Sequence, residues 1–143
     1  MANASKTVTM AVAREKFWKA VTDYMSYPTF VDGVHKVEII SKEGTSSKVR
    51  YGISLMNKEI NYLLNHDESA IPNKMEWSCV ESNFLKSNKG SWVVKELGPE
   101  KIEVTYTVEI EFTIPVPSLM LSPIIRSTLP RMLDSFEKKA KAL

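Results

Sequence analysis

The sequence predicts one α+β domain, spanning residues 1–143, in which a curved antiparallel sheet of about seven strands wraps around a long C-terminal helix. Three observations support this fold class. Apolar residues recur at every second position through most of the stretch from Val34 to Ile114, and at helical spacing from Ser118 to Leu143. The length of 143 residues is that of a single domain. A flat sheet of this size would leave apolar surface uncovered by one helix, so we expect the sheet to curve.

The N-terminal part is predicted to hold a strand and one or two short helices. The first strand is expected over Thr7–Val12, where apolar and polar residues alternate. A short helix is expected over Arg14–Asp23, where the apolar spacing changes to that of a helix. Pro28 is expected to end this pattern, which leaves at most one more helical turn over Thr29–Asp32.

About six strands are predicted to follow, each with alternate residues on the core side. The strand from Ile102 to Ile114 is expected to be the longest, because it alternates for about 13 residues with one dry and one wet face. Strand parity places aromatic and apolar side chains on the inner face at Tyr51, Ile53, Tyr62, Leu64, His66, Trp77, Trp92 and Tyr106.

The last segment, Ser118–Leu143, is predicted to be the long helix. Its apolar positions follow helical spacing at Leu121, Ile125, Leu129, Met132, Phe136 and Ala140. Pro130 is expected to kink or break this helix.

Composition excludes several classes of function. The net charge of +2 is too small to predict nucleic-acid binding. The single cysteine, Cys79, excludes an internal disulfide and a cysteine-based zinc cluster. His35 and His66 are far apart in the chain and no glycine-rich nucleotide motif occurs, so we expect no metal and no cofactor. No signal-peptide pattern or membrane-spanning apolar run is visible, so the expected location is the cytoplasm.

Several short motifs resemble one known group of proteins. The segment Phe17–Val31 is similar to a helix-and-turn pattern F-x-x-V-x-D-x-x-x-Y-P-x-F, and shorter similarities lie at Gly90–Trp92, Val104–Tyr106 and Leu129–Leu133. Together with the order of elements, they resemble the START-like (SRPBCC) superfamily of helix-grip domains, and within it the polyketide cyclase/dehydrase family. The stretch Phe17–Val31 is most similar to the branch of coenzyme-Q-binding and ribosome-associated toxin-like proteins.

The resemblance implies a cavity between the sheet and the long helix, and a hydrophobic ligand such as a lipid, a quinone or a polyketide. We therefore predict a protein that binds or transports such a molecule, with no metal and no cofactor. The ligand-binding residues are expected to be Tyr51, Ile53, Tyr62, Leu64, His66, Trp77, Trp92, Tyr106, Ile125, Leu129 and Met132. A mostly apolar lining with a few polar groups is typical of sites for small apolar ligands.

Two alternatives stay open at this stage. An enzyme of the cyclase or dehydrase type would need an acid/base group, and His66 is the weak candidate because it is the histidine on the inner face. Its strand ends in polar residues, however, so a solvated histidine beside Asp67 is the expectation. The other alternative is an interaction protein, like the ribosome-associated relatives, although the charge argues against direct RNA contact.

Other candidate residues have simpler interpretations. Cys79 is expected to be a small core residue, and Glu109 and Glu111 to lie on the solvated face of their strand. Arg126 is expected to face solvent, with binding of a ligand carboxylate or phosphate as the alternative. The consecutive apolar residues Leu119–Leu121 cannot all face one core, so we hypothesise a cavity entrance that opens toward an apolar partner or toward a membrane, with which it would make transient contact.

Overall fold

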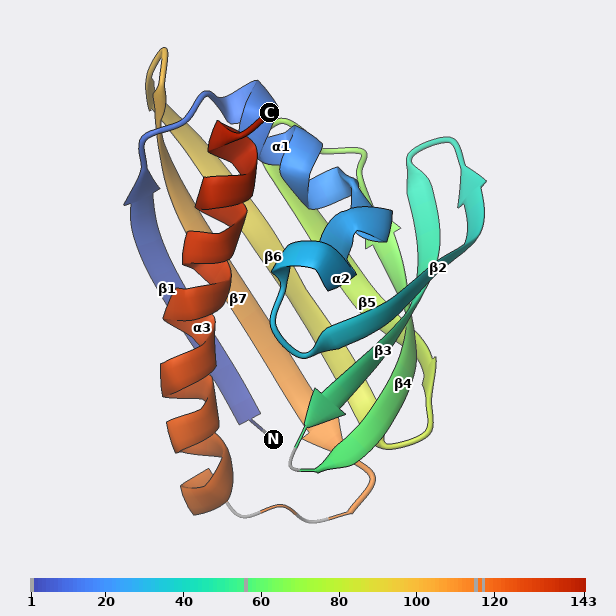
Figure 1. Cartoon of the computed structure of the whole chain (residues 1–143). Coiled ribbons are helices and arrows are strands. Elements are labelled where there is room, and N and C mark those ends of the chain that lie inside the picture. The colour runs from blue at the N-terminus through green and yellow to red at the C-terminus, as the bar shows by residue number, and fades with distance from the viewer. Residues whose placement is uncertain (1, 56, 115, 117) are drawn as a thin grey trace.

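The computed structural model describes residues 2–55, 57–114, 116 and 118–143, with side chains except those at positions 2, 55 and 118–125. The elements follow along the chain (Figure 1) as β1 (Ala2–Met10), α1 (Arg14–Thr22), the 3-10 helix η1 (Tyr24–Ser26), α2 (Tyr27–Phe30), β2 (Val34–Glu43), β3 (Ser46–Leu55), β4 (Lys58–Asp67), β5 (Lys74–Ser82), β6 (Leu85–Gly98), β7 (Lys101–Phe112) and α3 (Ser118–Lys141).

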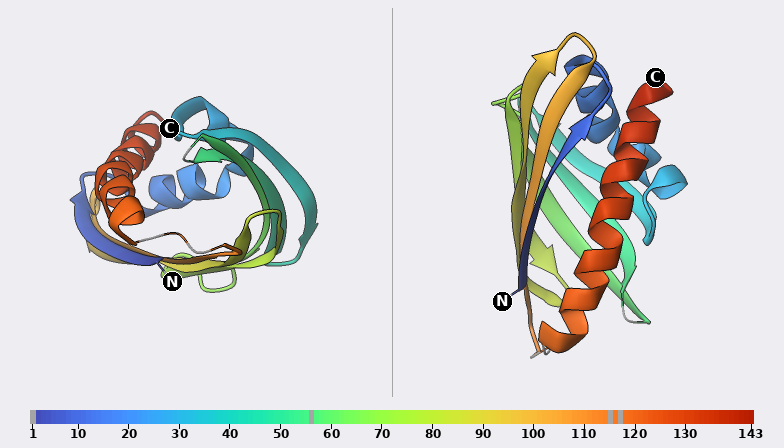
Figure 2. Two further views of the ribbon diagram at one scale, coloured as in Figure 1. Left: turned by 90° about the horizontal axis from the view of Figure 1, so that it is seen from below. Right: turned by 90° about the vertical axis from the view of Figure 1, so that its left-hand side faces the viewer.

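The seven strands form one antiparallel sheet in the order β1-β7-β6-β5-β4-β3-β2. The sheet curves strongly, and α1 and α3 lie on its concave side (Figure 2). This arrangement confirms the predicted helix-grip architecture. Among the described residues, no helix has the length and apolar character needed to cross a membrane.

The N-terminal elements differ in their bounds from the prediction. The strand expected over Thr7–Val12 occupies Ala2–Met10 instead, because it pairs along β7 from Ala2 opposite Ile110 to Met10 opposite Ile102. Residues 2–6 carry little apolar alternation, so backbone pairing and not hydrophobic patterning places them in the sheet.

The sequence predicts that Pro28 ends the first helical pattern, but the structure places the end of the first helix before Pro28. The break lies at Asp23, whose backbone is not helical (φ −85°, ψ 68°), and Pro28 stands in the first turn of α2. A proline is tolerated there because its missing N–H has no partner within the helix at that position.

The longest strand is β6 with 14 residues, and not β7 with 12, which corrects the prediction. Residues 85–91 of β6 are mostly polar and carry no apolar alternation, so the sequence pattern predicts only the second half of this strand, which carries Trp92 and Val94. Strand β7 ends at Phe112, and Ile114 lies beyond it with half of its surface exposed.

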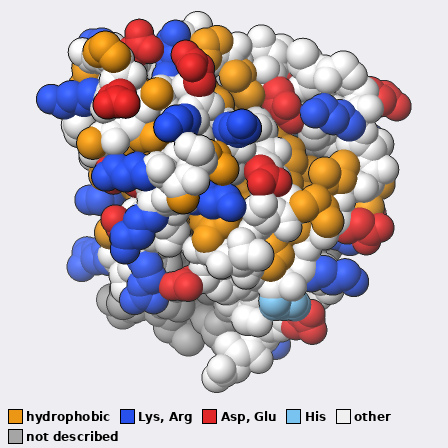
Figure 3. All heavy atoms as spheres, turned by 45° about the horizontal axis from the view of Figure 1, so that its top comes forward, with side chains coloured by type: hydrophobic (Ala, Val, Ile, Leu, Met, Phe, Trp, Pro, Cys, Tyr) orange, Lys and Arg blue, Asp and Glu red, His pale blue; other side chains and the backbone are white. Residues whose placement is uncertain are grey.

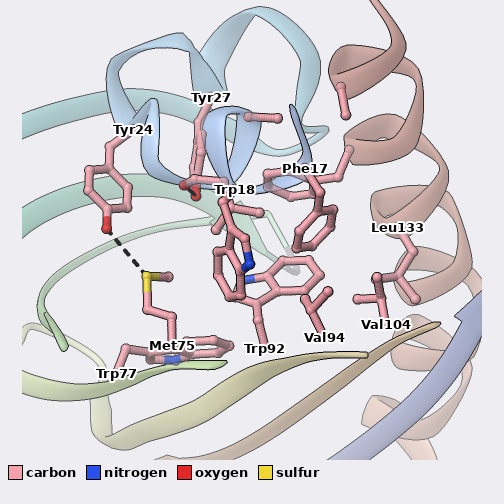
Figure 4. Packing of buried hydrophobic residues seen from close by; sticks show 14 of the residues in the cluster. Phe17, Trp18, Tyr24, Tyr27, Met75, Trp77, Trp92, Val94, Val104 and Leu133 are labelled. Atoms are coloured by element: carbon pink, nitrogen blue, oxygen red, sulfur yellow. Dashed lines mark hydrogen bonds between the residues drawn. The ribbon is translucent and has the colours of Figure 1, made fainter. Parts of the chain in front are cut away.

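Helix α3 continues through Pro130 without a break. The core forms where its C-terminal half faces α1 and the sheet. Phe17 of α1 is fully buried and meets Trp92 of β6 edge to face, with ring centroids 5.5 Å apart (Figure 4). Trp92 in turn meets Phe136 of α3 with ring centroids 5.1 Å apart. These aromatic contacts join both helices to the sheet.

Candidate ligand cavity

A cavity of about 400 Å³ lies between the concave face of the sheet, α2 and α3. Ten of the eleven residues predicted to bind ligand contribute to its wall: Tyr51, Ile53, Tyr62, Leu64, His66, Trp77, Trp92, Tyr106, Leu129 and Met132. Strand parity and helical spacing thus identified residues whose side chains lie around one cavity. Their role in binding stays a prediction. The side chains of Ile125 and of Leu119–Leu121 lie outside the described residues.

The inward-facing residues of β7 show where the core ends and the cavity begins. Ile102 and Val104 are fully buried against the core, whereas Tyr106, Val108 and Ile110 are only partly buried although they share the same face. The last three line the cavity. The concave face is therefore packed solid beneath α1 and open farther along β7.

His66 is buried, with 4% of its surface exposed, so the expectation of a solvated strand end was wrong. The cause is Tyr24 of η1, whose ring stacks on the imidazole with centroids 4.6 Å apart. His66 Nε2 lies 2.8 Å from the Tyr51 hydroxyl. Within the described part of the chain, its Nδ1 is buried and has no hydrogen-bond partner.

Burial keeps the inner side chains neutral. It lowers the pKa of His66 to about 3, because the imidazolium form would lose its hydration. Burial also raises the pKa of the Tyr51, Tyr62 and Tyr106 phenols above the ordinary range of tyrosine. At neutral pH these four groups are therefore uncharged hydrogen-bonding groups.

Trp77 is held in the cavity wall by two neighbours on β6. Its indole N–H donates to Asn88 Oδ1 at 3.1 Å. Gly90 lies opposite Trp77 in the sheet, and a Cβ at Gly90 would stand only 2.4 Å from the Trp77 ring. The glycine thus lets the indole lie across the neighbouring strand.

Several lining residues were not predicted from the sequence, and those with polar side chains include Asn88, Tyr27 and Arg131. Asn88 was detectable by parity, since it stands four positions before Trp92 and therefore on the same face. Tyr27 was not detectable in this way, because it lies in α2, where no strand pattern applies. Its hydroxyl is engaged, since it donates to the Val21 carbonyl.

The charged lining residues among those described are Asp32 and Arg131, and they pair with each other across 3.5 Å. Both side chains are mostly exposed, so they mark the outer part of the cavity. On the face shown in Figure 3, Lys and Arg side chains gather along the side where α3 lies, and hydrophobic side chains are visible in the middle of that face.

The other singled-out residues lie away from the cavity. Cys79 is half-buried against the core, its thiol donates to the Glu81 carbonyl at 3.5 Å, and burial raises its pKa. Arg126 is exposed, as expected. His35 is exposed as well, with Nε2 3.4 Å from a carboxylate oxygen of Glu59.

Glu109 and Glu111 of β7 lie on its outer face, as expected. Glu109 pairs with Lys89 at 3.2 Å and Glu111 with Lys86 at 3.6 Å, so both are engaged in ion pairs between β7 and β6. Neither glutamate contributes to the cavity.

Comparison with known proteins assigns the chain to a family. The model of the family described as polyketide cyclase/dehydrase and lipid transport matches residues 10–137. The chain belongs to this family. A relative with a curated name is the ribosome association toxin RatA of Escherichia coli, which is 21% identical over 141 residues, covering 99% of this chain and 88% of RatA.

Solved structures of the same architecture superpose over nearly the whole chain. A START superfamily protein from Mycobacterium smegmatis has a TM-score of 0.87 at 19% identity, covering 98% of this chain and 97% of that protein. The Zhui aromatase/cyclase from Streptomyces sp. R1128 has a TM-score of 0.85 at 16% identity, covering 98% and 93%. These similarities confirm the START-like fold of this member of the polyketide cyclase/dehydrase family.

Proposed function

We propose that this protein binds an apolar small molecule in the cavity between the sheet and α3, and holds or carries it without chemical change. The observation that carries the proposal is the cavity itself, whose 400 Å³ are bounded mainly by aliphatic and aromatic side chains. Cavities of this kind suit small ligands, and apolar burial contributes roughly 25 cal/mol per Å². The family description, which includes lipid transport, is consistent with this proposal.

A cyclase or dehydrase acting in the same cavity is the second candidate, because the family description includes these enzymes and because Tyr51 and His66 form a hydrogen bond at its wall. An acid/base catalyst works best when its pKa lies near the working pH. The pKa of His66 is lowered to about 3 and that of Tyr51 is raised, so neither group exchanges protons readily at neutral pH. The binding function is therefore the one that we favour.

Filling the cavity should strongly weaken ligand binding. Val108→Trp would project an indole into the space, since Val108 lines the cavity and is flanked in the sheet by the small residues Ala4 and Gly90. We expect the affinity for the neutral dye N-phenyl-1-naphthylamine to fall at least about tenfold, because the added ring takes up volume that the dye would occupy. Titration of the dye fluorescence measures this effect.

The matched control is Val93→Trp, on the outer face of the neighbouring strand, where Val93 is 43% exposed. This variant should bind the dye like the wild type. Equal affinity in wild type and Val108→Trp would show that the dye does not occupy the cavity, and would contradict the proposed function. Extraction of the purified protein followed by mass spectrometry should also yield apolar molecules from the wild type and fewer from Val108→Trp.

A further inference from the structure

The tyrosines that line the cavity or lie next to it fall into two groups. The hydroxyls of Tyr24 and Tyr51 are engaged, with Glu68 at 2.9 Å and with His66 at 2.8 Å. Within the described part of the chain, the hydroxyls of Tyr62 and Tyr106 make no hydrogen bond to protein, and neither oxygen is fully sealed from the cavity. Polar groups inside proteins are normally paired, so two free hydroxyls in one cavity require an explanation.

Two further donors lie along the same wall. Asn88 Oδ1 accepts from Trp77, which leaves its NH₂ group without a partner among the described residues. Trp92 is the cross-strand neighbour of Tyr106, with ring centroids 4.7 Å apart, and its indole N–H also has no partner among them. The amide NH₂ and the indole N–H can only donate hydrogen bonds. A ligand that satisfies them must therefore carry a hydrogen-bond acceptor.

We propose that the cavity selects apolar ligands that carry a neutral acceptor oxygen, such as a ketone, and that Tyr62 and Tyr106 bind this oxygen. The inference rests on the proposed function and specifies its ligand class. Asn88 and Trp92 supply further donors along the same wall, to which a ligand with a second carbonyl would bind.

The electrostatics of the cavity favour a neutral oxygen over a carboxylate. Arg131 is the cationic lining residue among those described, and it is exposed and paired with Asp32. The deeper groups, Tyr62, Tyr106 and the buried His66, are neutral. A carboxylate brought to them would lose its hydration without gaining an opposite charge, which is costly.

The shape of the cavity also orients the ligand. From Tyr106 the lining of β7 continues through Val108 and Ile110 to Phe112, toward the end of the strand that lies far from α1 (Figure 1). Val108, Ile110 and Phe112 offer apolar contacts only. We therefore expect the oxygen to lie beside the tyrosines and the apolar body to extend along the second half of β7.

Three compounds with one ring system test the proposal: 2-acetylnaphthalene, 2-ethylnaphthalene and 2-naphthoate. Removing one hydroxyl in Tyr62→Phe or Tyr106→Phe should lower the affinity for 2-acetylnaphthalene about three- to tenfold, which is the usual contribution of one hydrogen bond. The affinity for 2-ethylnaphthalene should change less than about twofold, because the ring is retained. Wild-type protein should bind 2-naphthoate at least about tenfold more weakly than the ketone. Isothermal titration calorimetry at pH 7.5 measures all three.

Tyr24→Phe is the matched control, since Tyr24 lies outside the cavity and its hydroxyl is already bonded. It should lower the stability and leave the ratio of ketone to hydrocarbon affinity unchanged. If both cavity variants keep the wild-type ratio, or if 2-naphthoate binds best, the inference is wrong although the cavity still binds apolar compounds. If folded wild-type protein binds none of the three, the proposed function fails and the inference with it.

Discussion

Gly90→Ala is expected to lower the free energy of unfolding by about 3 kcal/mol, the upper part of the range for overpacking a closed site. A Cβ at Gly90 would lie 2.2 Å from the backbone carbonyl oxygen of Thr107 and 2.4 Å from Cζ2 of Trp77. The indole could only move away by leaving Asn88, to which it donates a hydrogen bond, and the carbonyl belongs to the adjacent strand of the sheet. Urea denaturation measures the loss.

Gly98→Ala is the control on the same strand. Its nearest neighbour would be Cβ of Lys101 at 3.9 Å, an ordinary contact, so we expect a change within about 0.5 kcal/mol. Because Trp77 lines the cavity, Gly90→Ala should also weaken binding of N-phenyl-1-naphthylamine. If Gly90→Ala unfolds at the same urea concentration as Gly98→Ala, then Gly90 is not needed for the packing of Trp77.

The case of Gly90 shows what strand parity can and cannot predict. Parity counted back from Trp92 places Gly90 and Asn88 on the inner face, but it does not say which residue of β5 lies opposite. That depends on the register between β5 and β6, which puts Trp77 directly opposite Gly90. The register follows from packing across the whole sheet, so a single strand does not encode it.

The fold itself was predictable because its signals are periodic and long. Alternation along β3, β4 and β7 predicted the inward-facing residues of these strands, and six of the residues predicted to bind ligand come from them and line one cavity: Tyr51, Ile53, Tyr62, Leu64, His66 and Tyr106. The weakly patterned segments were misplaced: residues 2–6 of β1 and residues 85–91 of β6 enter the sheet through backbone pairing. Asn88 lies in this polar half of β6, which is why it is absent from the residues predicted to line the cavity.

The depth of a residue is the property that the sequence predicted least well. Parity placed His66 on the inner face, and the neighbouring Asp67 suggested a solvated strand end. What buries His66 is Tyr24, which lies 42 positions earlier in the chain and reaches the imidazole because η1 continues past the break at Asp23. A contact across that distance follows from the tertiary fold and leaves no local pattern.

Acid should destabilise this protein through His66 already between pH 7 and pH 5. An imidazole in the unfolded chain has a pKa of about 6.5, whereas burial lowers the pKa of folded His66 to about 3. Between these two values the unfolded state binds the additional proton, so the free energy of unfolding falls as the pH falls. From pH 7 to pH 5 this linkage should remove about 2 kcal/mol.

Urea denaturation at half-unit steps between pH 7 and pH 5 tests this expectation in the wild type, His66→Gln and His35→Gln. His66→Gln keeps a side chain that can form a hydrogen bond with the Tyr51 hydroxyl and removes the titrating group, so the stability of this variant should depend much less on pH. His35→Gln removes the exposed histidine and should still lose stability toward pH 5, because His66 is present. Parallel profiles for the wild type and His66→Gln would mean that the imidazole is hydrated in the folded protein. In that case the neutral inner wall inferred for the cavity would also be wrong.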